Sequence, residues 1–160
     1  MGLVTRVLLL FLSLNACGAC AGDTDAPAIT LRNIDGVVER HIFRESKLTM
    51  VHFWATWCAP CKKELPRLIR LSNRLRSRGL SLVLVAADSR KATSDYIHQY
   101  KLNAAVLIDQ YGKAMYDYKI EGLPTTVMID RSGRIVAFHK GMVDWQKDDI
   151  IARIERLLGD

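Results

Sequence analysis

The chain has 160 residues, of which 49% are apolar and 25% are charged, and its formal net charge is +6. This length favours one domain with a single ordinary core, and the composition is typical of a soluble globular protein. The basic residues are spread along the chain rather than massed in one block, so we expect no nucleic-acid partner.

The N-terminus has the pattern of an export signal. Arg6 precedes a short apolar run at residues 7–14, which is too short to span a bilayer and fits the hydrophobic region of a signal peptide. The stretch LNAC, which ends at Cys17, resembles a bacterial lipobox and predicts cleavage before Cys17 and lipidation of it. The stretch ACA around Cys20 is a competing site for ordinary signal peptidase.

These features predict three regions. Residues 1–16 form a signal peptide, favoured to be of the lipoprotein type, residues 17–27 form a tether, and residues 28–160 form one folded domain. Within the domain, strand hairpins are expected at 28–43 and 125–141, buried strands at 47–55 and 80–88, and a further strand at 104–109. Helices are expected from Cys58 to Leu75 and at 91–101, 113–120 and 146–158. The first helix should be kinked at Pro66 and stopped by Gly79, and the second should be capped by Thr93 or Ser94.

This alternation of strands and helices predicts an α/β fold, with a central mixed sheet, helices on both faces and an N-terminal β-hairpin. The run at 47–55 is almost continuously apolar, as expected of a parallel strand buried on both faces.

Two cysteines, Cys58 and Cys61, lie in the predicted domain, in the stretch FWATWCAPCKKELP. A disulfide scaffold needs several spaced pairs, and structural zinc needs four ligands, of which one CxxC supplies two. At a helix N-terminus, unpaired N–H groups and the helix dipole favour a thiolate. We therefore interpret Cys58 as the attacking thiolate and Cys61 as the resolving thiol, against the alternative of a permanently closed, inert disulfide.

The chain resembles the thioredoxin-like proteins, and among them the extracytoplasmic TlpA/ResA/DsbE-like thiol-disulfide oxidoreductases. The resemblance covers roughly residues 28–160 and rests on FWATWCAPCKKELP, on GLPTTVMIDRSGRIV at 122–136 and on Gly141. It implies a thioredoxin-like fold with a TlpA-like insertion before the second motif. It also implies a cis bond before Pro124, with the Leu123 backbone and neighbouring Thr125 available to bind a substrate strand beside Cys58.

Four further side chains near the cysteines have candidate roles. Trp57 is expected to shield the pair and contact partners, whereas Trp54 is expected to pack in the core. Glu64 lies one helical turn after Cys61, so it is either a proton acceptor that also restrains the acidity of the Cys58 thiol or an acid that complements the helix dipole. His52 takes the place of an acid in thioredoxin, and is either a base or a hydrogen-bonded core residue.

The resulting functional hypothesis is an exported, lipid-anchored oxidoreductase of the periplasm that uses no small cofactor and binds no metal. It would reduce specific protein disulfides, for example those of apocytochrome c or of copper-site assembly proteins. A reductase in an oxidising compartment needs electrons, so a membrane thiol-disulfide relay is implied as partner. The alternatives are a disulfide oxidant or isomerase, and a copper-binding assembly factor.

Overall fold

The computed structural model describes residues 24–159. The secondary structure agrees closely with the expected order of elements. The elements are β1 Ile29–Asn33, β2 Val38–His41, β3 Leu48–Trp54, α1 Ala59–Leu75, the 3-10 turn η1 Arg76–Arg78, β4 Leu80–Ala86, α2 Arg90–Tyr100, β5 Ala105–Ile108, α3 Lys113–Asp117, β6 Thr125–Asp130, β7 Ile135–Lys140 and α4 Asp148–Leu158.

The seven strands form one mixed sheet in the order β2-β1-β5-β4-β3-β6-β7. Strands β3, β4 and β5 run parallel to one another, while β6 and β7 on one side and β1 and β2 on the other join antiparallel. The predicted mixed sheet is therefore confirmed. The segment between β4 and β6 adds β5 to the sheet and α3 beside it, which is where the insertion was expected.

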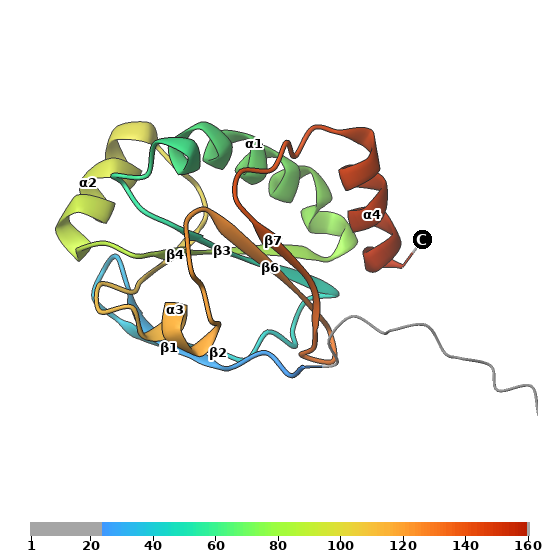
Figure 1. Cartoon of the computed structure of the whole chain (residues 1–160), viewed down its shortest axis with the longest axis horizontal. Helices are drawn as coiled ribbons and strands as arrows, with labels where there is room; N and C mark the ends of the chain where they lie inside the picture. Colours follow the sequence, from blue (N-terminus) through green and yellow to red (C-terminus); the bar gives the residue numbers. More distant parts are fainter. Residues whose placement is uncertain (1–23, 160) are drawn as a thin grey trace, which may run out of the picture.

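Two apolar layers cover the two faces of the sheet, and β3 contributes to both because successive strand residues point to opposite faces. Leu48, Met50 and Trp54 pack in one core with α1, α4 and the inner side of α2. Val51 and Phe53 pack in the other core with α3. Figure 1 shows the same division, with α1, α2 and α4 above the sheet and α3 below it. Every residue of β3 is buried, as its apolar sequence predicts.

Helix α1 begins directly after Cys58, which is its N-cap, and Pro60 lies in its first turn, where a missing N–H costs nothing. The helix continues through Pro66 as far as Leu75. The following 3-10 turn ends at Gly79, whose φ of 102° is in the region that favours glycine. The start and the stop of this helix were both predicted from the sequence.

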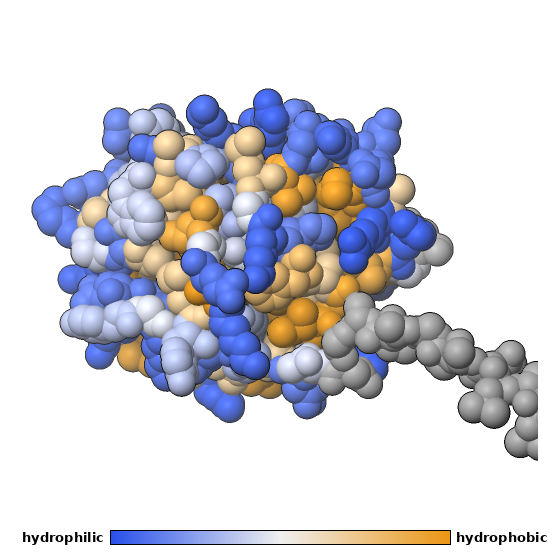
Figure 2. Space-filling view, viewed as in Figure 1, coloured by the Kyte–Doolittle hydropathy of each residue, from blue (hydrophilic) through white to orange (hydrophobic). Residues whose placement is uncertain are grey.

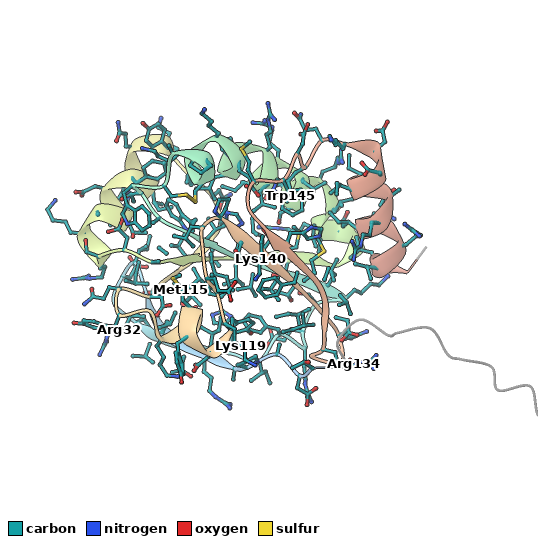
Figure 3. The ribbon with its side chains drawn as sticks, in the orientation of Figure 1. Arg32, Met115, Lys119, Arg134, Lys140 and Trp145 are labelled. Carbon is teal, nitrogen blue, oxygen red and sulfur yellow. A yellow bond between two sulfur atoms is a disulfide. The ribbon has the colours of Figure 1, made fainter. Side chains whose placement is uncertain are left out.

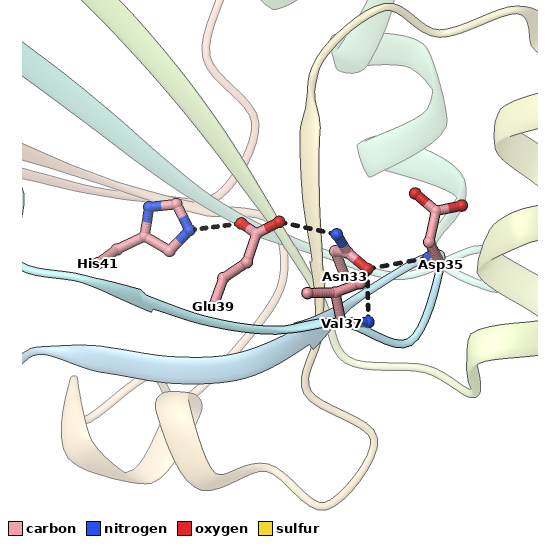
Figure 4. Close-up of polar contacts among 5 residues, drawn as sticks. All are labelled: Asn33, Asp35, Val37, Glu39 and His41. Carbon is pink, nitrogen blue, oxygen red and sulfur yellow. Dashed lines mark hydrogen bonds and ion pairs between the residues drawn. The ribbon is translucent and has the colours of Figure 1, made fainter.

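The N-terminal hairpin is fixed by side chains of its own strands and turn (Figure 4). The Asn33 side-chain oxygen accepts hydrogen bonds from the backbone N–H groups of Asp35 and Val37, both at 3.0 Å. Its amide nitrogen donates to Glu39 at 2.7 Å, and Glu39 also contacts the His41 ring at 2.9 Å. An asparagine that bonds to the backbone after it favours a tight turn, so this hairpin is encoded locally.

The first described residues lie against the turn between β6 and β7. Asp25 bridges Arg134, and the Ala26 N–H donates to the Gly133 carbonyl at 2.8 Å. Residues 24–26 of the predicted tether thus already contact the domain, because they lie beside the start of β7. The signal peptide and Cys17 lie outside the described residues. No helix within 24–159 has the length and apolar character needed to span a membrane.

The predicted cap of α2 was wrong. The helix starts one residue earlier than expected, at Arg90, and its N-cap is Ser89, whose hydroxyl accepts from the Ala92 N–H at 3.2 Å. The two expected caps, Thr93 and Ser94, both lie within the helix, where Thr93 is fully buried. Ser89 can act as the cap because its own backbone is extended, with φ −66° and ψ 150°, which is the conformation of an N-cap residue.

Candidate active site

The two cysteines form a disulfide at the N-terminus of α1, with a Cα–Cα distance of 5.3 Å. The Cys61 N–H points at the Cys58 sulfur, at 3.3 Å. Cys61 is completely buried, whereas Cys58 keeps 5% of its surface exposed. Cys58 is therefore the less buried of the two cysteines, and its sulfur lies next to an N–H group of the first helical turn, where a thiolate is stabilised.

The loop before Cys58 is anchored to the end of the neighbouring strand β4. The Asp88 carboxylate accepts from the Thr56 hydroxyl at 2.5 Å and from the Thr56 N–H at 3.2 Å. The side chain that follows, Trp57, is 68% exposed. The loop thus holds Cys58 in a fixed position and presents a large aromatic surface beside it. Trp54, by contrast, is fully buried and packs on Tyr96.

The second motif lies at the same end of the sheet as the disulfide. Phe53, near the end of β3, pairs with Thr125, the first residue of β6, so Pro124 lies where β3 leads towards Cys58. The Leu123–Pro124 bond is cis, as the resemblance implied. The Pro124 carbonyl accepts from the Gly141 N–H at 2.8 Å. The backbone N–H and carbonyl of Leu123 have no hydrogen-bond partner among residues 24–159, so they are available to an incoming strand.

Glu64 is a buried carboxyl group on α1, with 2% of its surface exposed. It accepts a hydrogen bond of 2.5 Å from the Trp145 indole N–H and a longer one of 3.4 Å from the Val143 N–H. Burial raises the pKa of Glu64, and the two hydrogen bonds oppose that rise in part. The carboxyl group therefore holds a proton more readily than an exposed glutamate does.

His52 is fully buried on β3, on the face of the sheet that α1 covers. Its Nδ1 lies 2.9 Å from the Thr126 hydroxyl, and its Nε2 has no partner among the described residues. Burial lowers the pKa of His52 to about 3, so the imidazole is neutral near pH 7. The sequence left two roles open for His52, a base or a hydrogen-bonded core residue. In the structure His52 is a hydrogen-bonded core residue, and its low pKa makes it a weak base.

A row of polar side chains runs across this face of the sheet. His52, Thr126 and His139 are successive cross-strand partners on β3, β6 and β7. The His139 ring meets the edge of Trp145 at 6.0 Å, and Trp145 reaches Glu64, as described above. Figure 3 shows Trp145 beneath α1, at the upper side of the sheet. Burial, and then the charge of Arg153, lower the pKa of His139.

Four residues of this site were not predicted from the sequence, namely Trp145, Thr126, His139 and Asp88. Trp145 is almost fully buried in a loop between β7 and α4, where no periodic pattern marks it. The one available signal was that polar residues on strands as apolar as β3 and β6 must find buried partners. Such a rule could have suggested a contact between His52 and a strand hydroxyl, but not the indole that holds Glu64.

This arrangement is suited to thiol-disulfide exchange. It offers a cysteine at a helix N-terminus, a second and more deeply buried cysteine in the first helical turn, a free backbone edge for a substrate strand and a buried carboxyl group whose pKa is raised. Among residues 24–159 no group of three or more His, Cys, Asp or Glu side chains is placed to hold a metal ion.

Comparisons with known proteins give the same class. A model of the AhpC/TSA family matches residues 22–138. The thiol-disulfide oxidoreductase ResA of Bacillus thuringiensis subsp. konkukian is 31% identical over 119 residues, covering 73% of this chain and 68% of that protein. ResA of Geobacillus thermodenitrificans is 27% identical over 97% of this chain and 95% of its own. A thiol:disulfide interchange protein of Chlorobium tepidum has a similar structure, with a TM-score of 0.73, 27% identity, and coverage of 88% and 100%.

The fold and the paired cysteines thus define a thioredoxin-like protein, and the chain belongs to the AhpC/TSA family. More particularly, it is a thiol-disulfide oxidoreductase similar to ResA, and the disulfide at the start of α1 is its only pair of cysteines among residues 24–159.

Proposed function

We propose that the protein reduces specific protein disulfides outside the cytoplasm, and that the Cys58–Cys61 couple carries the two electrons. The observation that carries this proposal is the difference between the two cysteines, because Cys58 is the N-cap of α1 and keeps 5% of its surface exposed, whereas Cys61 lies in the first turn and is completely buried. That difference fits an attacking and a resolving thiol. The similarity to proteins named as thiol-disulfide oxidoreductases supports the same reading.

The reaction starts from the reduced pair. The Cys58 thiolate attacks one sulfur of the substrate disulfide, the substrate S–S bond breaks, and the other substrate sulfur leaves as a thiolate that takes up a proton. Cys61 then loses its proton and attacks the Cys58 sulfur, which closes the disulfide and releases the second substrate thiol. Two electrons pass to the substrate, and an external dithiol of a membrane relay must return two electrons to the protein.

Glu64 is the group that we assign to the proton of Cys61. Its pKa is raised by burial, so it can take up a proton within the helix turn that follows Cys61. A neutral His52, whose pKa is about 3, holds a proton far less well at neutral pH. A nearby carboxylate would also oppose thiolate formation at Cys58, and the helix N-terminus would act in the opposite direction.

The Leu123 backbone, with Pro124 and Thr125, is assigned to substrate binding, and Trp57 to contact with the partner. A substrate strand that pairs with Leu123 would bring its disulfide to Cys58, because both lie at the same end of the sheet. Trp57 is exposed beside the disulfide, where an aromatic surface adds contact area at a small cost in side-chain entropy.

Two measurements test the proposed direction of electron flow. A reductase should have a potential nearer to about −270 mV than to about −120 mV, which are the values of a general reductant and of a strong disulfide oxidant. The variant Cys61→Ser should accumulate mixed disulfides with natural substrates through Cys58, while Cys58→Ser should form none. A potential near the oxidising value, with no reduction of protein disulfides, would instead indicate an oxidant.

Export is the remaining part of the proposal. The apolar run at 7–14 and the stretch LNAC support cleavage before Cys17, acylation of its thiol and amino group, and a periplasmic, membrane-anchored mature chain. Intact-mass analysis of the mature protein should therefore show acyl groups on an N-terminal Cys17. A chain that starts at Gly22 without lipid would contradict the anchor but not the redox chemistry.

A further inference from the structure

The exposed side of α1 carries five cations and no exposed acid. Its one acidic residue, Glu64, is buried. Four of the cations, Lys63, Arg67, Arg70 and Arg74, occur three or four positions apart, and such residues lie on one side of a helix. Lys62 precedes Lys63 at the start of this row. We name this surface the α1 cationic face. Its members, all exposed, are Lys62, Lys63, Arg67, Arg70 and Arg74.

The charges of this face are mostly not neutralised within the molecule. Arg67 contacts Asp144 at 3.5 Å, and the other four members have no ion pair among residues 24–159. On α2 and α3 some of the positive charge is neutralised, because Lys91 pairs with Asp95 and Lys113 pairs with Asp117, both at 2.6 Å, and on α4 three acidic residues outnumber two arginines. The positive charge is therefore concentrated on the helix that carries the redox pair.

The face borders a groove between α1 and the segment that leads from β7 into α4. A cavity of 470 Å³ is bounded by Lys63, Arg67, Met142 and Val143, with Glu64 at its wall and Asp144 beside it. In Figure 2, hydrophilic side chains gather along the upper edge, where Figure 1 places α1, and apolar surface lies just beneath them.

A second cavity, of 460 Å³, continues the groove along the helix and shares Arg67 with the first. Its cations are Arg70 and Arg74, and its apolar wall includes Leu71 and Ile151. Trp145, Gln146 and Asp148 complete its lining. The groove thus combines a cationic rim with an apolar wall. Its four cations, Lys63, Arg67, Arg70 and Arg74, outnumber its three carboxyl groups, Glu64, Asp144 and Asp148.

We infer that this groove binds an acidic segment of the substrate protein, close in sequence to the cysteine that reacts with Cys58. The inference rests on the proposed function, for which it specifies the class of substrate. Lys62 directly follows Cys61, so the α1 cationic face starts at the redox pair. From Lys62 to Arg74 the helix extends about 18 Å, which an extended peptide covers with about five or six residues.

A protein segment fits this surface better than an anionic membrane does. The cations line a groove rather than a flat face, and a peptide can fill a groove while contacting the apolar wall. In addition, the proposed lipid anchor precedes the described residues in the chain. The first described residues lie near the turn between β6 and β7, on the opposite side of the molecule from α1 (Figure 1). Opposite charge at such a surface raises association rates and favours acidic partners over basic ones.

The experiment compares two peptides that have the same length and a single cysteine held as a pyridyl disulfide, flanked either by aspartates or by lysines. Release of the thiopyridone reports the rate of attack by the reduced wild-type protein. We expect the acidic peptide to react about tenfold faster or more at low salt, with the ratio falling towards one as salt is added. The triple variant Arg67→Glu, Arg70→Glu and Arg74→Glu should abolish or reverse the ratio.

A matched control separates the groove from the net charge of the protein. The triple variant Arg40→Glu, Lys91→Glu and Arg131→Glu makes the same total change in charge at exposed positions away from α1, and it should keep the preference for the acidic peptide. Equal loss in both triple variants, or no preference in the wild type, would overturn the inference.

Two further outcomes have distinct meanings. A reduced wild-type protein that attacks neither of the two peptide disulfides, at low or at high salt, would contradict the proposed function rather than the groove. Sedimentation with vesicles of anionic lipid tests the other source of negative charge. If the α1 variant lost vesicle binding but kept the wild-type peptide preference, the surface would be a membrane-binding one and the inference would be wrong.

Discussion

The protein should lose less stability between pH 7 and pH 5 when His52 is replaced by asparagine. The pKa of His52 is lowered from 6.5 to about 3 by burial. Below pH 6.5 the unfolded chain therefore binds a proton that the native protein does not bind. Stability linked to this group is fully present above pH 6.5 and is lost as the pH falls towards 3.

The magnitude follows from the size of the shift. Each pKa unit corresponds to about 1.4 kcal/mol, so His52 should cost about 2 kcal/mol of stability at pH 5 and about 5 kcal/mol below pH 3. Asparagine can still hydrogen-bond the Thr126 hydroxyl but does not titrate. The raised pKa of Glu64 acts with the opposite sign, because it favours the native state at lower pH, and it is present in both proteins, so it cancels in the comparison.

The assay is urea unfolding of the oxidised protein at pH 7 and pH 5, so that the cysteines do not titrate. The difference in the free energy of unfolding between the two pH values should be about 2 kcal/mol smaller in His52→Asn than in the wild type. His98→Asn, at an exposed position on α2, should keep the wild-type difference. An equal fall in stability in wild type and His52→Asn would refute the reasoning.

Two other predictions concern the helix that carries the redox pair. Trp145→Phe removes the indole N–H that donates to Glu64, so the pKa of Glu64 should rise further and the pH midpoint of the resolving step should move upward with it; Glu64→Gln should abolish that pH dependence, and an unchanged profile in both variants would remove Glu64 from the mechanism. Leu68→Ala, at a fully buried position of α1, should cost about 2–5 kcal/mol in urea unfolding, and a cost below about 1 kcal/mol would mean that α1 packs more loosely than described.

The sequence by itself determined the parts of the protein that depend on neighbours along the chain. The apolar run of β3, the periodic face of α1 and the glycine that ends its last turn all follow from local spacing and backbone preference. The placement of Cys58 and Cys61 at a helix start follows in the same way. The cis bond before Pro124 was predicted from a family resemblance, because X-Pro bonds in either form are close in energy and spacing alone does not decide between them.

Only the tertiary structure decided which distant groups meet at the site. The bond from Trp145 to Glu64 joins residues 81 positions apart, and its existence depends on the path of an irregular loop over α1. The row of His52, Thr126 and His139 requires the register of three strands, and a shift of one residue would turn each side chain to the other face. Burial of Glu64 and His52 then moves their pKa values in opposite senses, because desolvation always favours the neutral form, which is protonated in an acid and deprotonated in a base.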